Sequence, residues 1–138
     1  MKYTNNAIFT RVYEELKDLD ETINVTQTYS PIPSKFPTVY IREIGRLTPA
    51  DTATLSNAQD ISERTWEAQV FSNLGPGAKE QAYQLLDAVK SVLRTLYFVE
   101  TFESPMEQTD KTIYCLVARF RRVIGSGEDM PERSIPSI

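Results

Sequence analysis

The sequence contains no histidine, and its only cysteine is Cys115. Without histidine the chain cannot build a Ser-His-Asp triad, a Cys-His dyad or a histidine-based metal site. A single cysteine also excludes a disulfide within one chain. We therefore predict that the protein is not an enzyme and has no catalytic, cofactor-binding or metal-binding residues.

Long apolar runs are also missing. No stretch reaches the roughly 18–20 apolar residues that span a bilayer, and the polar start at residues 1–6 leads into a charged helix instead of a signal peptide. The 15 basic and 19 acidic side chains leave a net charge of −4, which argues against a nucleic-acid binder that relies on overall basic charge. We expect a soluble protein, made inside the cell, with no membrane partner.

What the chain does contain is an ordinary globular balance, with 138 residues, 41% of them hydrophobic and 25% charged. This length and composition suit a single domain with one modest core. We place that domain at residues 1–124. The remaining residues, 125–138, begin with Gly-Ser-Gly and continue as an acidic, proline-containing stretch, which predicts a flexible C-terminal arm.

Periodicity predicts the elements. Apolar residues at helical spacing indicate helices over 5–20 and 78–97. Alternation and β-branched composition indicate strands over 22–29, 38–44, 63–73, 97–103 and 111–124. The resulting order, α-β-β-loop-β-α-β-β, is dominated by local hairpins, which predicts an α+β fold with an antiparallel sheet and two packed helices.

Residues 45–62 show neither period and are rich in Ser, Thr, Asp and Ala. Structureless segments of this length are uncommon in compact domains and are often functional or mobile. Two alternatives stay open for this loop, a flexible hairpin tip and a functional segment.

Few residues combine into a chemical site. The carboxylates do not converge in the way that acid–base catalysis needs, and Cys115 lies mid-strand with no base, which favours a buried, inert thiol. The Gly75-Pro76-Gly77 turn lacks the Lys-Ser/Thr pair of a phosphate-binding loop and is explained as a helix start. Trp66 is expected in the core, with an interface anchor as the alternative.

Charge is unevenly distributed. Residues 111–124 hold Lys111, Arg119, Arg121 and Arg122 without an acid, a net of +4, whereas residues 11–21 have a net of −3. Alternation places Arg119 and Arg121 on one face and Arg122 on the other. Three hypotheses compete: a nucleic-acid patch, ion pairing with the acidic helix, and a contact with an acidic protein neighbour. Because the chain is acidic overall, we favour the protein contact, with interface candidates that also include Glu14, Glu15 and Asp18.

Three segments resemble a known family. These are the strand at residues 66–73, the following Gly-rich turn with Lys79 and the helix at 82–89, and the strand at 112–121. The amino-acid sequences of these segments and the order of the elements resemble those of the tail terminator, or tail-completion, proteins of long-tailed bacteriophages. The resemblance covers about residues 5–124.

This resemblance implies a structural virion protein, made in the bacterial host cytoplasm and placed at the tail–head junction. Family members form a ring, typically a hexamer, that caps the head-proximal end of the tail tube, stops tube polymerisation and docks onto the head-side connector or stopper protein. The long loop commonly faces the lumen or the tube, which here assigns that position to Arg46, Asp51 and Asp60. DNA would pass through such a ring without specific binding.

Two alternatives remain from the sequence. One is a head-completion adaptor of the same neck, which would bind portal-side partners in place of tube protein. The other is a small ligand-binding or enzymatic α+β domain, which needs a convergent polar pocket and would depend on Glu67, Glu100 and Arg119.

Overall fold

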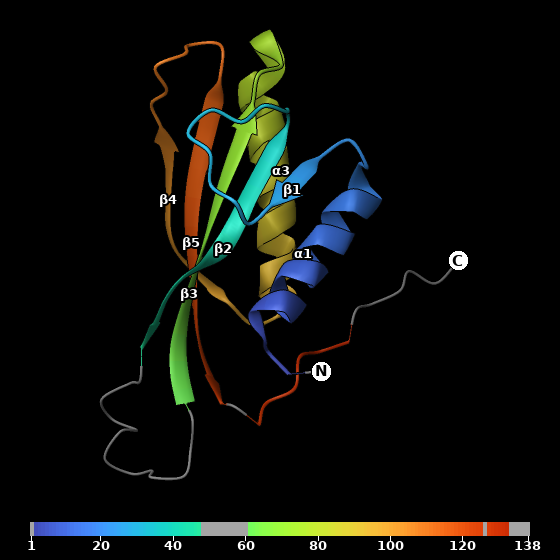
Figure 1. The fold of residues 1–138 in the computed structure, drawn as a ribbon, viewed down its shortest axis with the longest axis vertical. Helices are drawn as coiled ribbons and strands as arrows, with labels where there is room; N and C mark the ends of the chain where they lie inside the picture. The colour runs from blue at the N-terminus through green and yellow to red at the C-terminus, as the bar shows by residue number, and fades with distance from the viewer. Residues whose placement is uncertain (1, 48–60, 126, 133–138) are drawn as a thin grey trace.

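The structure is a computed structural model that describes residues 2–47, 61–125 and 127–132. It confirms the α+β class and the predicted order of elements (Figure 1). The helices and strands are α1 (Asn5–Leu19), β1 (Asn24–Thr26), β2 (Thr38–Leu47), β3 (Ile61–Ser72), a 3-10 turn at Gly75–Gly77, α3 (Ala78–Thr95), β4 (Val99–Met106) and β5 (Tyr114–Gly125). No helix within these ranges is both long and apolar enough to cross a bilayer.

The five strands form one mixed sheet in the order β1-β2-β3-β5-β4. Three of its four pairings are antiparallel, but β1 runs parallel to β2, so the prediction of an antiparallel sheet is wrong at this edge. The cause is the connection at residues 27–37, which carries the chain back to the start of β2 before pairing resumes. Parallel pairing requires such a return path.

The first strand was predicted over residues 22–29, but in the structure it covers only Asn24–Thr26. Side-chain oxygens of Asp20 and Thr26 accept hydrogen bonds from the backbone N–H groups of Thr22 and Thr28, at 2.9 and 3.0 Å. These local turns bond the backbone groups that would otherwise extend the ladder.

The prediction that residues 45–62 are irregular is wrong at both ends of this segment. β2 continues to Leu47 and β3 begins at Ile61, with Gly45 opposite Thr65 and Arg46 opposite Arg64. An irregularity between Glu43 and Gly45 shifts the register there, and such a bulge breaks the alternation by which a sequence pattern reveals a strand. Residues 48–60 lie outside the described ranges.

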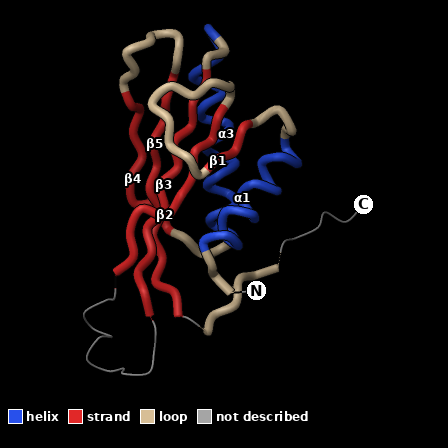
Figure 2. The backbone as a smooth tube through the Cα atoms, in the orientation of Figure 1, coloured by secondary structure: helices blue, strands red, loops and turns tan. Residues whose placement is uncertain are grey.

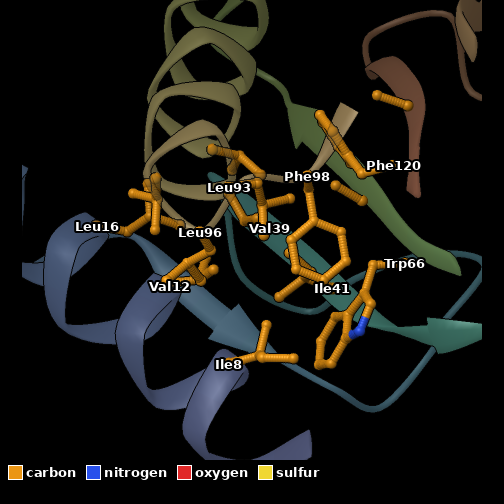
Figure 3. Close-up of a cluster of buried hydrophobic side chains, with 14 of the residues drawn as sticks. Ile8, Val12, Leu16, Val39, Ile41, Trp66, Leu93, Leu96, Phe98 and Phe120 are labelled. Atoms are coloured by element: carbon orange, nitrogen blue, oxygen red, sulfur yellow. The ribbon is translucent and has the colours of Figure 1, made fainter. Parts of the chain in front are cut away.

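Both helices pack on the same face of the sheet (Figure 2), and the main core lies between the two layers. Ile8, Val12 and Leu16 of α1 are fully buried there, because their helical spacing places them on one face. Trp66 is also fully buried and lies near Ile8 (Figure 3), which confirms its expected place in the core.

The segment after β5 contacts the start of the chain. Lys2 and Asp129 form an isolated antiparallel bridge and an ion pair of 2.9 Å. Arg11 donates a hydrogen bond of 2.7 Å to the carbonyl oxygen of Pro131, and Met130 is buried. Residues 127–132 of the predicted flexible arm are therefore docked beside α1, while 126 and 133–138 lie outside the described ranges.

Candidate interaction surface

Among the residues that the structure describes, the sheet face opposite the helices is covered at only one end. Tyr40, Phe71, Cys115 and Val117 point to this face and are buried. Phe36 of the proline-rich connection packs against the cluster that Phe71, Cys115 and Val117 form with Ile113. Tyr29 of the same connection meets Tyr40 edge-on, with ring centroids 5.5 Å apart. The connection at residues 27–37 thus replaces a helix over this part of the sheet.

Farther along the same face, large apolar side chains are exposed. Val99, Phe102 and Met106 of β4 expose 65%, 47% and 42% of their surface, and Val123 of β5 exposes 50%. Their register partners on β5 and β3 place them on the uncovered face, beside Arg119 and Arg121. We name this set the β4–β5 surface: Val99, Phe102, Met106, Arg119, Arg121 and Val123.

Arg119 and Arg121 lie on one face, as their alternation predicts, and each pairs with a glutamate of β3. Arg119 Nε lies 2.9 Å from Glu67 Oε2, and Arg121 Nη1 lies 3.1 Å from Glu63 Oε1. Both arginine side chains are about half exposed, whereas the glutamates are much less so. The guanidinium groups are therefore the outward members of these pairs, and that of Arg119 also lies 5.5 Å from the ring centre of Phe102.

Arg122 points to the opposite face, again as predicted, but its contacts are inside the protein. Its guanidinium lies between two rings, 4.6 Å from the centre of Tyr3 and 5.2 Å from that of Tyr97. It pairs with Glu128 and donates to the Tyr3 hydroxyl and, at 3.1 Å, to the Leu96 carbonyl. Only 14% of its side chain is exposed. The interface candidates on β5 thus reduce to Arg119 and Arg121.

Of the three residues assigned to the loop, only Arg46 lies in the described structure, and it belongs to β2. Arg46 and the buried Arg64 both bind the Glu43 carboxylate, with Nε–Oε1 and Nη2–Oε2 distances of 2.8 and 2.6 Å. Burial raises the pKa of Glu43, but the hydrogen bonds from Arg46 and Arg64 outweigh burial and lower it below its ordinary value. Both arginines also donate to Asn5 Oδ1, Arg46 at 3.2 Å and Arg64 at 2.5 Å, so the cluster joins β2 and β3 to the start of α1. Asp51 and Asp60 lie outside the described ranges.

The acidic candidates lie on the other side of the molecule. Figure 1 shows α1 and β4 at opposite lateral sides, in agreement with the sheet order, which puts β2 and β4 far apart. Glu14 and Asp18 are exposed on α1, and Glu15 is half-buried. We name the side of this helix that faces away from the core, with the residues after it, the α1 outer surface: Tyr13, Glu14, Lys17, Asp18 and Glu21.

The residues that a small-molecule site would require do not converge. Glu67 and Arg119 lie on the uncovered face, but Glu100 lies on the helix side of β4, where Lys90 pairs with it at 3.2 Å and also with Glu103. Cys115 is buried as predicted, and burial, with Glu67 nearby, raises the pKa of its thiol to about 12. At neutral pH this side chain is a thiol, which is a weak nucleophile.

Sequence reasoning missed the exposed apolar residues of β4. The run 97–103 has strand composition, but its exposure depends on β4 being the last strand of the sheet, which the sequence does not reveal. Among known proteins, no family model and no curated sequence matches the chain.

Proposed function

We propose that the protein is a structural ring subunit of a bacteriophage neck, a tail terminator that caps the head-proximal end of the tail tube and joins it to the head-side connector. The proposal combines the resemblance of residues 66–89 and 112–121 to this family with the surfaces that the fold exposes.

One observation carries the physical part of the proposal. The β4–β5 surface and the α1 outer surface are different in composition and lie at opposite lateral sides of the subunit. A closed ring of identical subunits needs two such unlike patches, because each copy uses one patch toward each neighbour. An exposed apolar set such as Val99, Phe102 and Met106 is typical of a surface that meets another protein.

The experiment begins with the mass of the purified protein. Light scattering after size exclusion and native mass spectrometry should give a closed oligomer, expected to be a hexamer, and negative-stain images should show rings. Added to tail tubes, the rings should sit at tube ends and halt further growth of the tube. A protein that stays monomeric at high concentration and ignores tube ends contradicts the proposal. Binding to the portal-side partner alone would instead indicate the head-completion adaptor.

A further inference from the structure

The β4–β5 surface has the dimensions of a helix-binding site. Two adjacent strands are about 4.8 Å apart, and a helix with its side chains is about 10 Å wide, so one helix covers two strands. The eight residues of β4 extend about 26 Å at about 3.3 Å each, and the 15 residues of α1 extend about 22 Å at 1.5 Å each. A helix of the length of α1 therefore fits this strip.

The charges on this strip favour an acidic partner. Arg119 and Arg121 are the more exposed members of their ion pairs. A guanidinium has five N–H donors, and one carboxylate contact uses only some of them, so each arginine has donors left for a second acidic group. The acids of β4 do not offset these arginines, because Glu100 and Glu103 point to the other face and pair with Lys90. The strip therefore combines apolar side chains with outward positive charge.

The chain itself contains a helix of the complementary kind. The α1 outer surface carries three acids, Glu14, Asp18 and Glu21, and one lysine, Lys17, so its net charge is −3 + 1 = −2. It also carries one large apolar side chain, Tyr13, which exposes 40% of its surface. Because α1 lies at the far side of its own subunit from β4, it cannot reach its own β4–β5 surface and can meet only that of another copy (Figure 1).

We infer that α1 of a second copy lies across the β4–β5 surface, with its carboxylates facing Arg119 and Arg121 and the ring of Tyr13 against Val99 and Phe102. This inference rests on the proposed function, because it specifies how ring subunits meet. Each uncovered sheet would gain a second helical layer from its neighbour, and the head-to-tail contact would repeat around the ring.

The test uses two variants that each remove one side of the contact. Val99→Glu/Phe102→Glu places carboxylates on exposed β4 positions, beside arginines that can accept them as partners. Glu14→Lys/Asp18→Lys reverses the charge of the α1 outer surface at exposed helix positions. Asp87→Lys, an exposed charge reversal on α3, is the matched control. Circular dichroism of each variant verifies that the fold is retained.

We expect each double variant alone to be monomeric at concentrations where the wild type and Asp87→Lys form rings. A 1:1 mixture of the two double variants should give a heterodimer of twice the subunit mass and nothing larger, because only one intact contact can form. A mixture that stays monomeric, or a double variant that assembles like the wild type, overturns the inference. A monomeric wild type would overturn the proposed function itself, so the two failures are distinguishable.

A second measurement does not depend on charge reversal. Phe102→Cys and Asp18→Cys variants are mixed and treated with a short bismaleimide, while the buried Cys115 reacts poorly. A cross-linked heterodimer supports the contact. Assembled rings that give no cross-link between these positions contradict it.

Discussion

The guanidinium of Arg122 stacks on the ring of Tyr3, with 4.6 Å between its central carbon and the ring centre, and also donates to the Tyr3 hydroxyl. These two residues join the segment before α1 to the end of β5. The ring centre of Tyr97 lies 5.2 Å from the central carbon of the same guanidinium, so the turn after α3 also contacts Arg122. Three parts of the chain that are distant in sequence therefore depend on one arginine.

Replacing Arg122 by methionine should destabilise the fold by about 2–4 kcal/mol, because a stacked, mostly buried charge and its hydrogen bonds to Glu128 and Leu96 are lost together. Urea denaturation followed by circular dichroism measures the change. The control is Arg119→Met, which removes an exposed ion pair and should cost less than about 1 kcal/mol. Equal effects of the two substitutions would contradict an internal role for Arg122.

Tyr97 adopts a left-handed backbone conformation, with φ of 67°, at the end of α3. The N–H groups of Tyr97 and Phe98 donate to the carbonyls of Arg94 and Leu93, which is the hydrogen-bond pattern of a helix end that favours glycine. Tyr97→Gly should therefore be more stable than Tyr97→Ala by about 1 kcal/mol, since both lose the ring and only glycine relieves the strain.

The matched comparison is at Ser91, an exposed position inside α3. There the order should reverse, with Ser91→Ala more stable than Ser91→Gly by about 1 kcal/mol. Thermal and urea unfolding of the four variants measure both differences. The same order at the two positions would show that the left-handed backbone of Tyr97 has no influence on stability.

Glu43 should make stability depend on pH. Because the pKa of Glu43 is lowered in the folded protein, its contribution is complete above the unfolded value of about 4.3 and is lost as the pH falls through the folded value. Glu43→Gln leaves the buried Arg64 without its carboxylate, which should cost about 3 kcal/mol at pH 7. The difference between wild type and variant, measured by urea denaturation from pH 7 to pH 3, should shrink below about pH 4. A constant difference over this range would contradict the assignment.

Cys115 should not react in the folded protein. Its thiol is buried and its pKa is raised to about 12, so both access and thiolate formation are disfavoured at pH 8. A chromogenic disulfide reagent should label no thiol in native buffer and one thiol per chain in denaturant. Rapid labelling of the native protein would show that the proline-rich connection moves away from the sheet and exposes Cys115.

The helices and the central strands could be predicted from the sequence because their periodicity is local. Ile8, Val12 and Leu16 mark the buried side of α1, and Trp66, Ala68 and Val70 mark the buried side of β3. The direction of β1 could not be predicted, since it depends on where the connection at 27–37 returns the chain. Arg46 was misplaced because the irregularity near Gly45 breaks the alternation of β2.

The candidate surface was only partly predictable. Alternation alone placed Arg119 and Arg121 on one face and Arg122 on the other. Their partners could not be predicted, because β3 and β5 are separated by α3 and β4 and the register between them is set by packing. The exposure of Phe102 could not be predicted from the sequence either, because it depends on β4 lying at the edge of the sheet.

The bridge between Lys2 and Asp129 has a practical consequence for engineering the chain. Because these two residues are bonded neighbours, a short linker could join the segments around them, and the chain could be reopened at a new position without altering the sheet. Labels attached to the side chains at positions 2 and 129 would therefore lie at the same corner of the molecule. Two labels at these positions report one site of the molecule, so a distance measurement across it needs a second label elsewhere.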